Sequence, residues 1–141
     1  MKKDTAKHDQ ASPLVGIILL VLSILLVVGN HTFAAPCAMH DGVWGPCHWI
    51  ERALLGVSVV LIVISGVRVF ERDEGERRGL SFACACLGVL VALLPGFLIE
   101  TCVDSTMACN EAMRPFVHCI GIVIALVGGT DLVMRLRAIG K

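Results

Sequence analysis

The sequence predicts an all-α polytopic membrane protein, a bundle of four transmembrane helices with both termini in the cytoplasm. Hydrophobic residues make up 56% of the 141 residues and charged residues only 17%, and the mean hydropathy is +0.81. Such a composition is atypical of water-soluble domains. The formal net charge is zero and the bases are not clustered along any one helix face, so nucleic acid is excluded as a partner.

Four apolar segments carry this prediction. Each is close to the ~20 residues that a helix needs to cross a hydrocarbon core of ~30 Å. Helices are expected rather than strands, because backbone amides in lipid must be satisfied within their own segment. We therefore expect a single membrane domain over residues 1–141, with spans at 14–34, 53–70, 80–99 and 115–134. These spans leave outer loops at 35–52 and 100–114 and a cytoplasmic loop at 71–79.

The first segment has one alternative interpretation. A lysine-bearing start, an apolar run and the small residues of "TFAA" are also typical of a cleavable secretory signal. The run is long for the apolar part of such a signal, and its removal would leave the other three helices in an awkward topology. Residues 14–34 are therefore kept as the first span.

Lysine and arginine are distributed unevenly along the chain. Of the 12 such residues, only Arg52 and Arg114 lie in the segments that follow the first and third spans. The positive-inside rule then places both termini and the middle loop in the cytoplasm. We expect a multi-pass protein of the cytoplasmic membrane whose other two loops face outside.

The two expected outer loops are rich in cysteine. Thiols on the outer side of a cytoplasmic membrane commonly end as disulfides, which predicts two structural disulfides among Cys37, Cys47, Cys102 and Cys109. The same loops offer soft and borderline ligands suited to copper, zinc or iron. The candidate metal ligands are Cys37, Cys47, His48, Cys102, Met107 and Cys109. The spacing matches no standard zinc framework, so both interpretations stay open and no cofactor is certain.

A membrane thiol-disulfide oxidoreductase is the enzyme alternative. The bacterial disulfide-forming quinone reductases and the vitamin K epoxide reductases have a similar plan of four helices with outer cysteine pairs. Their reactive C-x-x-C pair, whose spacing lowers one thiol pKa, is absent from this sequence. Phosphate-binding glycine loops, G-x-S-x-G and H-E-x-x-H are absent as well. The sequence therefore leans against an enzyme.

Small residues recur every four positions in the third and fourth spans. Such stripes let helix backbones approach closely within a membrane, so we expect helix packing there, between these two helices or onto a partner. The stripe residues are Cys84, Gly88, Ala92 and Gly96, then Gly121, Ala125 and Gly129. Pro95 is expected to kink the third helix near its outer end.

The apolar segments contain the ionisable residues Arg68, His118 and Asp131. Arg68 and Asp131 are close to the cytoplasmic ends of their helices, and we expect both to reach the interface; the alternative is an ion pair across the bundle. His118 is costly in lipid and is expected to face the bundle. There it would extend the cysteine cluster or hydrogen-bond a backbone carbonyl.

Three motifs carry a resemblance to a known family. "FAAPC", then "CHW" at the start of the second helix, and "CVDSTMACNEAMRPF" before the fourth are similar to an uncharacterised four-span bacterial membrane family, domain of unknown function 4418. That family's loop usually has a methionine and a basic residue before C-H-W, where this sequence has "WGPCHW". Members accompany MacB-like ABC transporter components. The resemblance therefore implies a small accessory or interaction subunit in the lipid bilayer, partnered by an ABC permease or a second copy.

Overall fold

The computed structural model describes residues 2–32, 45–100 and 109–139, and within them the chain is helical. Four α-helices follow one another: α1 (Lys2–His31), α2 (Pro46–Phe70), α3 (Glu74–Leu93) and α4 (Arg114–Ile139). A π-helical turn, Cys109–Met113, leads into α4. The all-α prediction is confirmed for these described residues.

Three of the four described helices are long and apolar enough to cross a membrane. They are the Pro13–His31 part of α1, all of α2, and the stretch Asn110–Ile139 that contains α4. Helix α3 falls short by this measure because its first turns are charged and it ends before Pro95. The composition of these three helices is that of a membrane protein.

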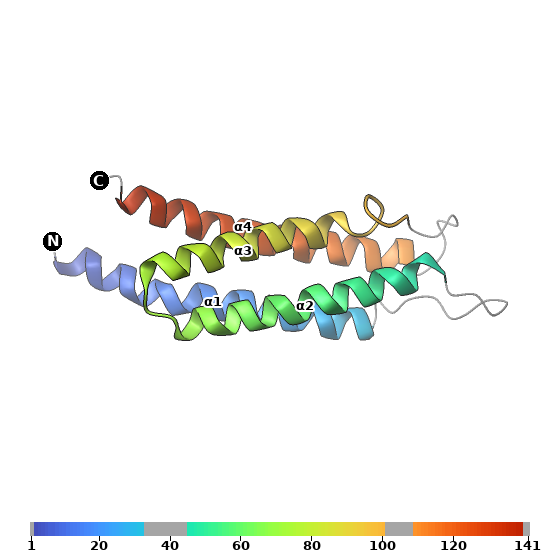
Figure 1. Cartoon of the computed structure of the whole chain (residues 1–141), viewed down its shortest axis with the longest axis horizontal. Coiled ribbons are helices and arrows are strands. Elements are labelled where there is room, and N and C mark those ends of the chain that lie inside the picture. Colours follow the sequence, from blue (N-terminus) through green and yellow to red (C-terminus); the bar gives the residue numbers. More distant parts are fainter. Residues whose placement is uncertain (1, 33–44, 101–108, 140–141) are drawn as a thin grey trace.

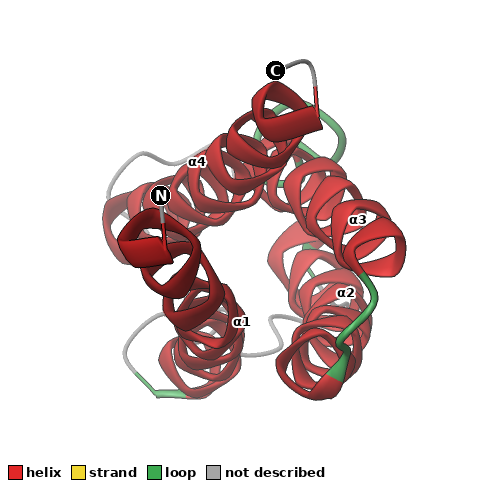
Figure 2. Cartoon of the chain, turned by 90° about the vertical axis from the view of Figure 1, so that its left-hand side faces the viewer, coloured by secondary structure: helices red, strands yellow, loops and turns green. Residues whose placement is uncertain are grey.

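The helices run alternately up and down the long axis of the molecule (Figure 1). Both chain ends and the α2–α3 turn lie at one end, and the start of α2 lies at the other. Seen from the first end, the four helices surround a common axis (Figure 2). This arrangement places the first turn of α3 beside the C-terminal part of α4, where Glu74 pairs with Arg135.

Each helix buries a stripe of residues spaced three or four positions apart. That period keeps one face of a helix toward its neighbours in a bundle. The stripe of α2 contains Cys47, Ile50, Leu54, Ser58, Leu61, Ser65 and Arg68. The stripe of α4 contains Val117, Gly121, Ile124, Gly128, Asp131 and Arg135. Polar groups thus share the core with aliphatic ones, and Arg68 is the largest fully buried side chain described.

Helix α2 begins earlier than the apolar run that predicts it. Gly45 is its N-cap residue and Pro46 occupies its first turn, where the missing N–H of proline has no helical partner to lose. Residues 46–52, which the hydropathy assigns to the outer loop, are therefore helical. Cys47 and His48 consequently have fixed directions on a helix.

Helix α3 ends at Leu93 and is not kinked at Pro95, so the predicted kink is wrong. A turn follows, in which Gly96 has a φ of 89° and its N–H donates to the Ile99 carbonyl at 2.9 Å. That φ favours glycine because a side chain would be strained there. The proline ends the helix because its ring is incompatible with a continuing helical hydrogen-bond ladder.

Candidate functional site

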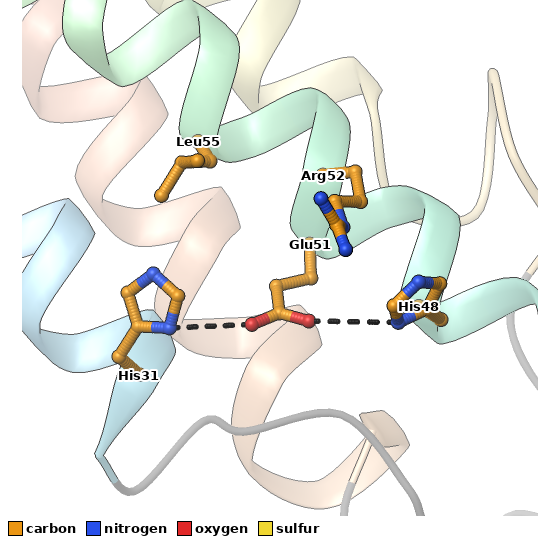
Figure 3. Close-up of a pocket in the computed structure, with 5 residues that line it drawn as sticks. All are labelled: His31, His48, Glu51, Arg52 and Leu55. Carbon is orange, nitrogen blue, oxygen red and sulfur yellow. Dashed lines mark ion pairs between the residues drawn. The ribbon is translucent and has the colours of Figure 1, made fainter. Parts of the chain in front are cut away.

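A polar pocket lies between the end of α1 and the beginning of α2, at the end of the bundle that carries Cys47 (Figure 3). Its volume is about 240 Å³, and it is lined by His31, His48, Glu51, Arg52 and Leu55. Pockets for small organic ligands usually measure ~300–1,000 Å³. This pocket is therefore of a size for a single inserted side chain.

Glu51 is the centre of the pocket. Its Oε1 lies 3.2 Å from Nδ1 of His31 on α1, and its Oε2 lies 3.9 Å from Nδ1 of His48 on α2. A carboxylate only accepts hydrogen bonds, so the His31 imidazole faces it as the donor, whereas the separation from His48 is longer than a hydrogen bond. One acidic side chain thus links the last turn of α1 to the first turns of α2.

Helical spacing explains why these side chains meet. His48 and Glu51 are three residues apart, and Leu55 follows four residues later, so all three lie on one side of α2. Cys47, one position before His48, points instead into the buried stripe and is 1% exposed. Trp49, one position after it, is 61% exposed and packs edge to face on the His48 ring.

The cysteine cap is only partly within the described structure. Cys37, Cys102 and Met107 lie outside the described residues, and of Cys109 the structure gives the backbone of the π-helical turn alone. Among the residues that are described, no group of three His, Cys, Asp or Glu side chains is placed to hold a metal ion. The two disulfides and the soft-metal site therefore remain predictions.

Of the pocket residues, His48 alone belongs to the set of candidate metal ligands named from the sequence; Glu51 and His31 are outside that set. The sequence does hold a signal for Glu51, namely its three-residue step from His48 on a helix. That signal depends on α2 beginning at Pro46, because the same residues in a loop have no common face. The contribution of His31 depends on how α1 packs against α2, which no local pattern specifies.

A second polar cluster is buried near the opposite end of the bundle. Oδ2 of Asp131 on α4 accepts from Nη2 of Arg68 on α2 at 2.6 Å and from Nε of Arg135 at 2.9 Å. The hydroxyl of Ser81 on α3 donates to the same oxygen at 2.7 Å and accepts from Nε of Arg68 at 2.9 Å. Arg135 also pairs with Glu74 on α3. Two guanidinium groups and two carboxylates thus join α2, α3 and α4.

The expectation that Arg68 and Asp131 reach the interface is wrong. The Arg68 side chain is 0% exposed, and the two residues pair across the bundle. The buried stripes of α2 and α4 explain this placement, because position 68 belongs to one and position 131 to the other. An intramembrane charge that faces inward needs a partner, and each supplies the other.

The small residues of α3 and α4 lie where the two helix backbones approach. A Cβ added to Gly88 would lie 2.5 Å from the Ala125 backbone nitrogen, and one added to Gly121 would lie 2.6 Å from that of Ala92. Neither position has room for a side chain. Cys84 is buried in the same stripe, with its sulfur 3.9 Å from the Ser65 hydroxyl.

Two members of the predicted stripes are placed elsewhere. The third close approach of α4 is made by Gly128, whose added Cβ would lie 2.9 Å from the Ala85 nitrogen, whereas one on Gly129 would meet nothing within 4 Å. A strict four-residue step drifts around a helix of 3.6 residues per turn, so the contact returns to the seventh residue after Gly121. Gly96 lies beyond the end of α3, beside the Arg114 guanidinium.

His118 faces the bundle, as expected. Its Nδ1 lies 2.6 Å from the carbonyl oxygen of Ala92 on α3. Of the two expected roles, His118 therefore has that of hydrogen bonding to a backbone carbonyl. This bond crosses the α3–α4 contact one turn from Gly121, and it fastens the two helices at the cysteine-bearing end.

Comparison with known proteins gives one match. A family model described as "Domain of unknown function (DUF4418)" matches residues 19–134, which contain the polar pocket, the α3–α4 contact and the buried charge cluster except Arg135. No curated protein and no solved structure matches the chain.

Proposed function

The chain belongs to the family described as domain of unknown function 4418, and from that premise we propose that it is a small integral membrane accessory subunit. In this proposal it binds another membrane protein, an ABC transporter permease. The end that carries Cys47 faces outside and is held by disulfides or by a soft metal. That end makes the contact.

The polar pocket around Glu51 is the observation that supports this proposal. It combines a carboxylate, a guanidinium and two imidazoles at a bundle end, and its size of about 240 Å³ suits one side chain of a partner. The groups stand on two helices, which hold recognition groups more rigidly than loops do. A partly open pocket that carries charged groups of this kind selects a partner by charge and register.

The buried charge cluster favours the same proposal over a transport path within this chain. Arg68 and Asp131 bond to each other and to Ser81, so these charges tie helices together. The distribution of bases supports the orientation: Arg72, Arg77 and Arg137 lie toward the end that holds both termini, which the positive-inside rule assigns to the cytoplasm.

Site-specific photocrosslinking in native membranes tests the proposal. A photoreactive residue in place of Arg52 should capture an ABC permease, and Glu51→Gln in the same chain should weaken that capture. The control carries the photoreactive residue in place of Val63, an exposed side chain in the lipid-facing middle of α2. Capture of only a second copy of the chain, or equal permease capture at both positions, would overturn the proposal.

A thiol-disulfide oxidoreductase remains the second candidate, for one reason. Cys47 lies in the first turn of α2, at the end of the bundle proposed to face outside, and His48 follows it. An enzyme of this kind cycles one disulfide with a quinone or an external thiol carrier. Reduction of the purified protein by such a carrier, abolished in Cys47→Ser, would favour the enzyme over the accessory subunit.

A further inference from the structure

A groove runs along the face of α4 that points away from the bundle, toward the end that holds the chain termini. Its volume is about 480 Å³, and all of its lining residues belong to α4. They are Ala125, Leu126, Gly129, Thr130, Val133, Met134 and Arg137. The groove lies apart from the polar pocket, which occupies the opposite end of the molecule.

Missing side chains make the groove. Gly129 and Ala125 form its floor, and a Cβ added to Gly129 would meet nothing within 4 Å. Leu126, Val133 and Met134 are exposed and form its walls. The Thr130 hydroxyl donates to the Leu126 carbonyl at 2.7 Å, so its hydrogen is already bonded within α4. The surface along this length therefore offers apolar contact.

Arg137 gives the groove one charged end. It lies 12 residues after Ala125, which on a helix is ~18 Å, comparable to the ~15 Å thickness of one hydrocarbon leaflet. Arg135, two positions earlier, is buried and bonded to Asp131 and Glu74. Arg137 is exposed and forms no ion pair with another described residue. An apolar groove with a single cation at its end matches a lipid that has an acyl chain and a phosphate.

We propose that this groove binds an anionic phospholipid, with an acyl chain along Gly129 and the phosphate on the Arg137 guanidinium. Arg137 lies at the end predicted to be cytoplasmic, where anionic lipids attract basic residues. A guanidinium binds phosphate oxygens through two parallel hydrogen bonds, which fixes the headgroup as well as attracting it. This site goes beyond the proposed accessory role and does not depend on it.

Native mass spectrometry of the full chain tests the site. The protein is released from detergent in the presence of equal amounts of phosphatidylglycerol and phosphatidylcholine, and retained lipid is counted. We expect one phosphatidylglycerol bound in preference to phosphatidylcholine. Arg137→Gln should reduce that preference about five-fold, and Gly129→Leu should reduce binding of both lipids by filling the groove.

Two matched variants serve as controls. Gly56→Leu adds the same side chain at an open position of α2, where an added Cβ also meets nothing within 4 Å. Arg72→Gln removes an exposed arginine from the α2–α3 turn at the same end of the bundle. Neither should change lipid retention. Equal retention of the two lipids, loss in Arg72→Gln equal to that in Arg137→Gln, or conversion of a dimer to a monomer by Gly129→Leu with lipid retention unchanged would overturn the proposal.

Discussion

Replacing Asp131 with leucine should be among the most destabilising single changes in this chain. Its Oδ2 accepts hydrogen bonds from Arg68, Ser81 and Arg135, at 2.6, 2.7 and 2.9 Å. Without the carboxylate, the Arg68 guanidinium keeps its charge in a core where it is 0% exposed. Breaking a buried pair by removing one partner typically costs about 3–5 kcal/mol.

Replacing the other partner of the ion pair, Arg68, is expected to cost less stability. In Arg68→Met, Asp131 still accepts from Arg135 and Ser81, so the loss is that of one charged hydrogen-bond partner, about 1.5–3 kcal/mol. The double variant leaves neither charge of the pair. It should be more stable than Asp131→Leu alone, with a coupling energy of about 1–3 kcal/mol.

Equilibrium unfolding in mixed detergent and sodium dodecyl sulfate, followed by far-UV circular dichroism, measures these free energies. The two single variants, the double variant and the unmodified chain form one thermodynamic cycle. The reasoning is refuted if Asp131→Leu costs less than about 1 kcal/mol, which is the level of an exposed ion pair. Additive single effects would also refute it, because the two side chains would then not act as a pair.

Three further outcomes follow from the helix contacts and the α2–α3 turn. Gly88→Leu should destabilise the α3–α4 contact by about 1–3 kcal/mol or prevent folding, since its Cβ would overlap the Ala125 backbone; Gly56→Leu should unfold like the unmodified chain. Cys84 should resist a lipid-soluble maleimide until unfolding, because it is fully buried; rapid labelling in the folded protein would contradict its place in the core. A hydrogen bond to Glu71, and then the repulsion between the two carboxylates, raises the pKa of Glu76. The favourable contribution of protonated Glu76 to stability is therefore present below pH 4.5 and is lost as the pH rises through the pKa of the folded protein. Glu76→Gln should accordingly stabilise the turn at neutral pH. Carboxyl-resolved NMR gives the pKa, and unfolding below pH 4.5 and at neutral pH gives the change in stability.

The cysteine-bearing end shows where local patterns stop being informative. The run of aliphatic residues predicts α2, but hydropathy cannot detect a first turn of cysteine, histidine, tryptophan and charges. Only the proline at position 46 marks the true start. The sequence patterns therefore do not predict the pocket around Glu51 as a site, although His48 is one of the candidate ligands and His31 is the last residue of α1.

The α3–α4 contact shows the opposite case. Gly88, Ala92, Gly121 and Ala125 stand in a pattern whose physical meaning is local, since a helix without side chains on one face admits a close neighbour. The structure places all four at that contact. The pattern fails at Gly129 because a step of four residues is longer than one turn of 3.6 residues, so successive positions rotate away from the contact. Gly129 lies instead on the floor of the groove.

The sequence by itself determined that this chain is helical, apolar and suited to a membrane, because hydrocarbon admits few backbone arrangements and the apolar runs have the required length. It also contained the residues of both polar clusters. Only the tertiary structure decided which charges meet. Arg68 and Asp131 are 63 positions apart, and nothing in their neighbours specifies whether each turns to the interface or to the other. That choice depends on the rotation of α2 against α4 about their axes, which packing of the whole bundle sets.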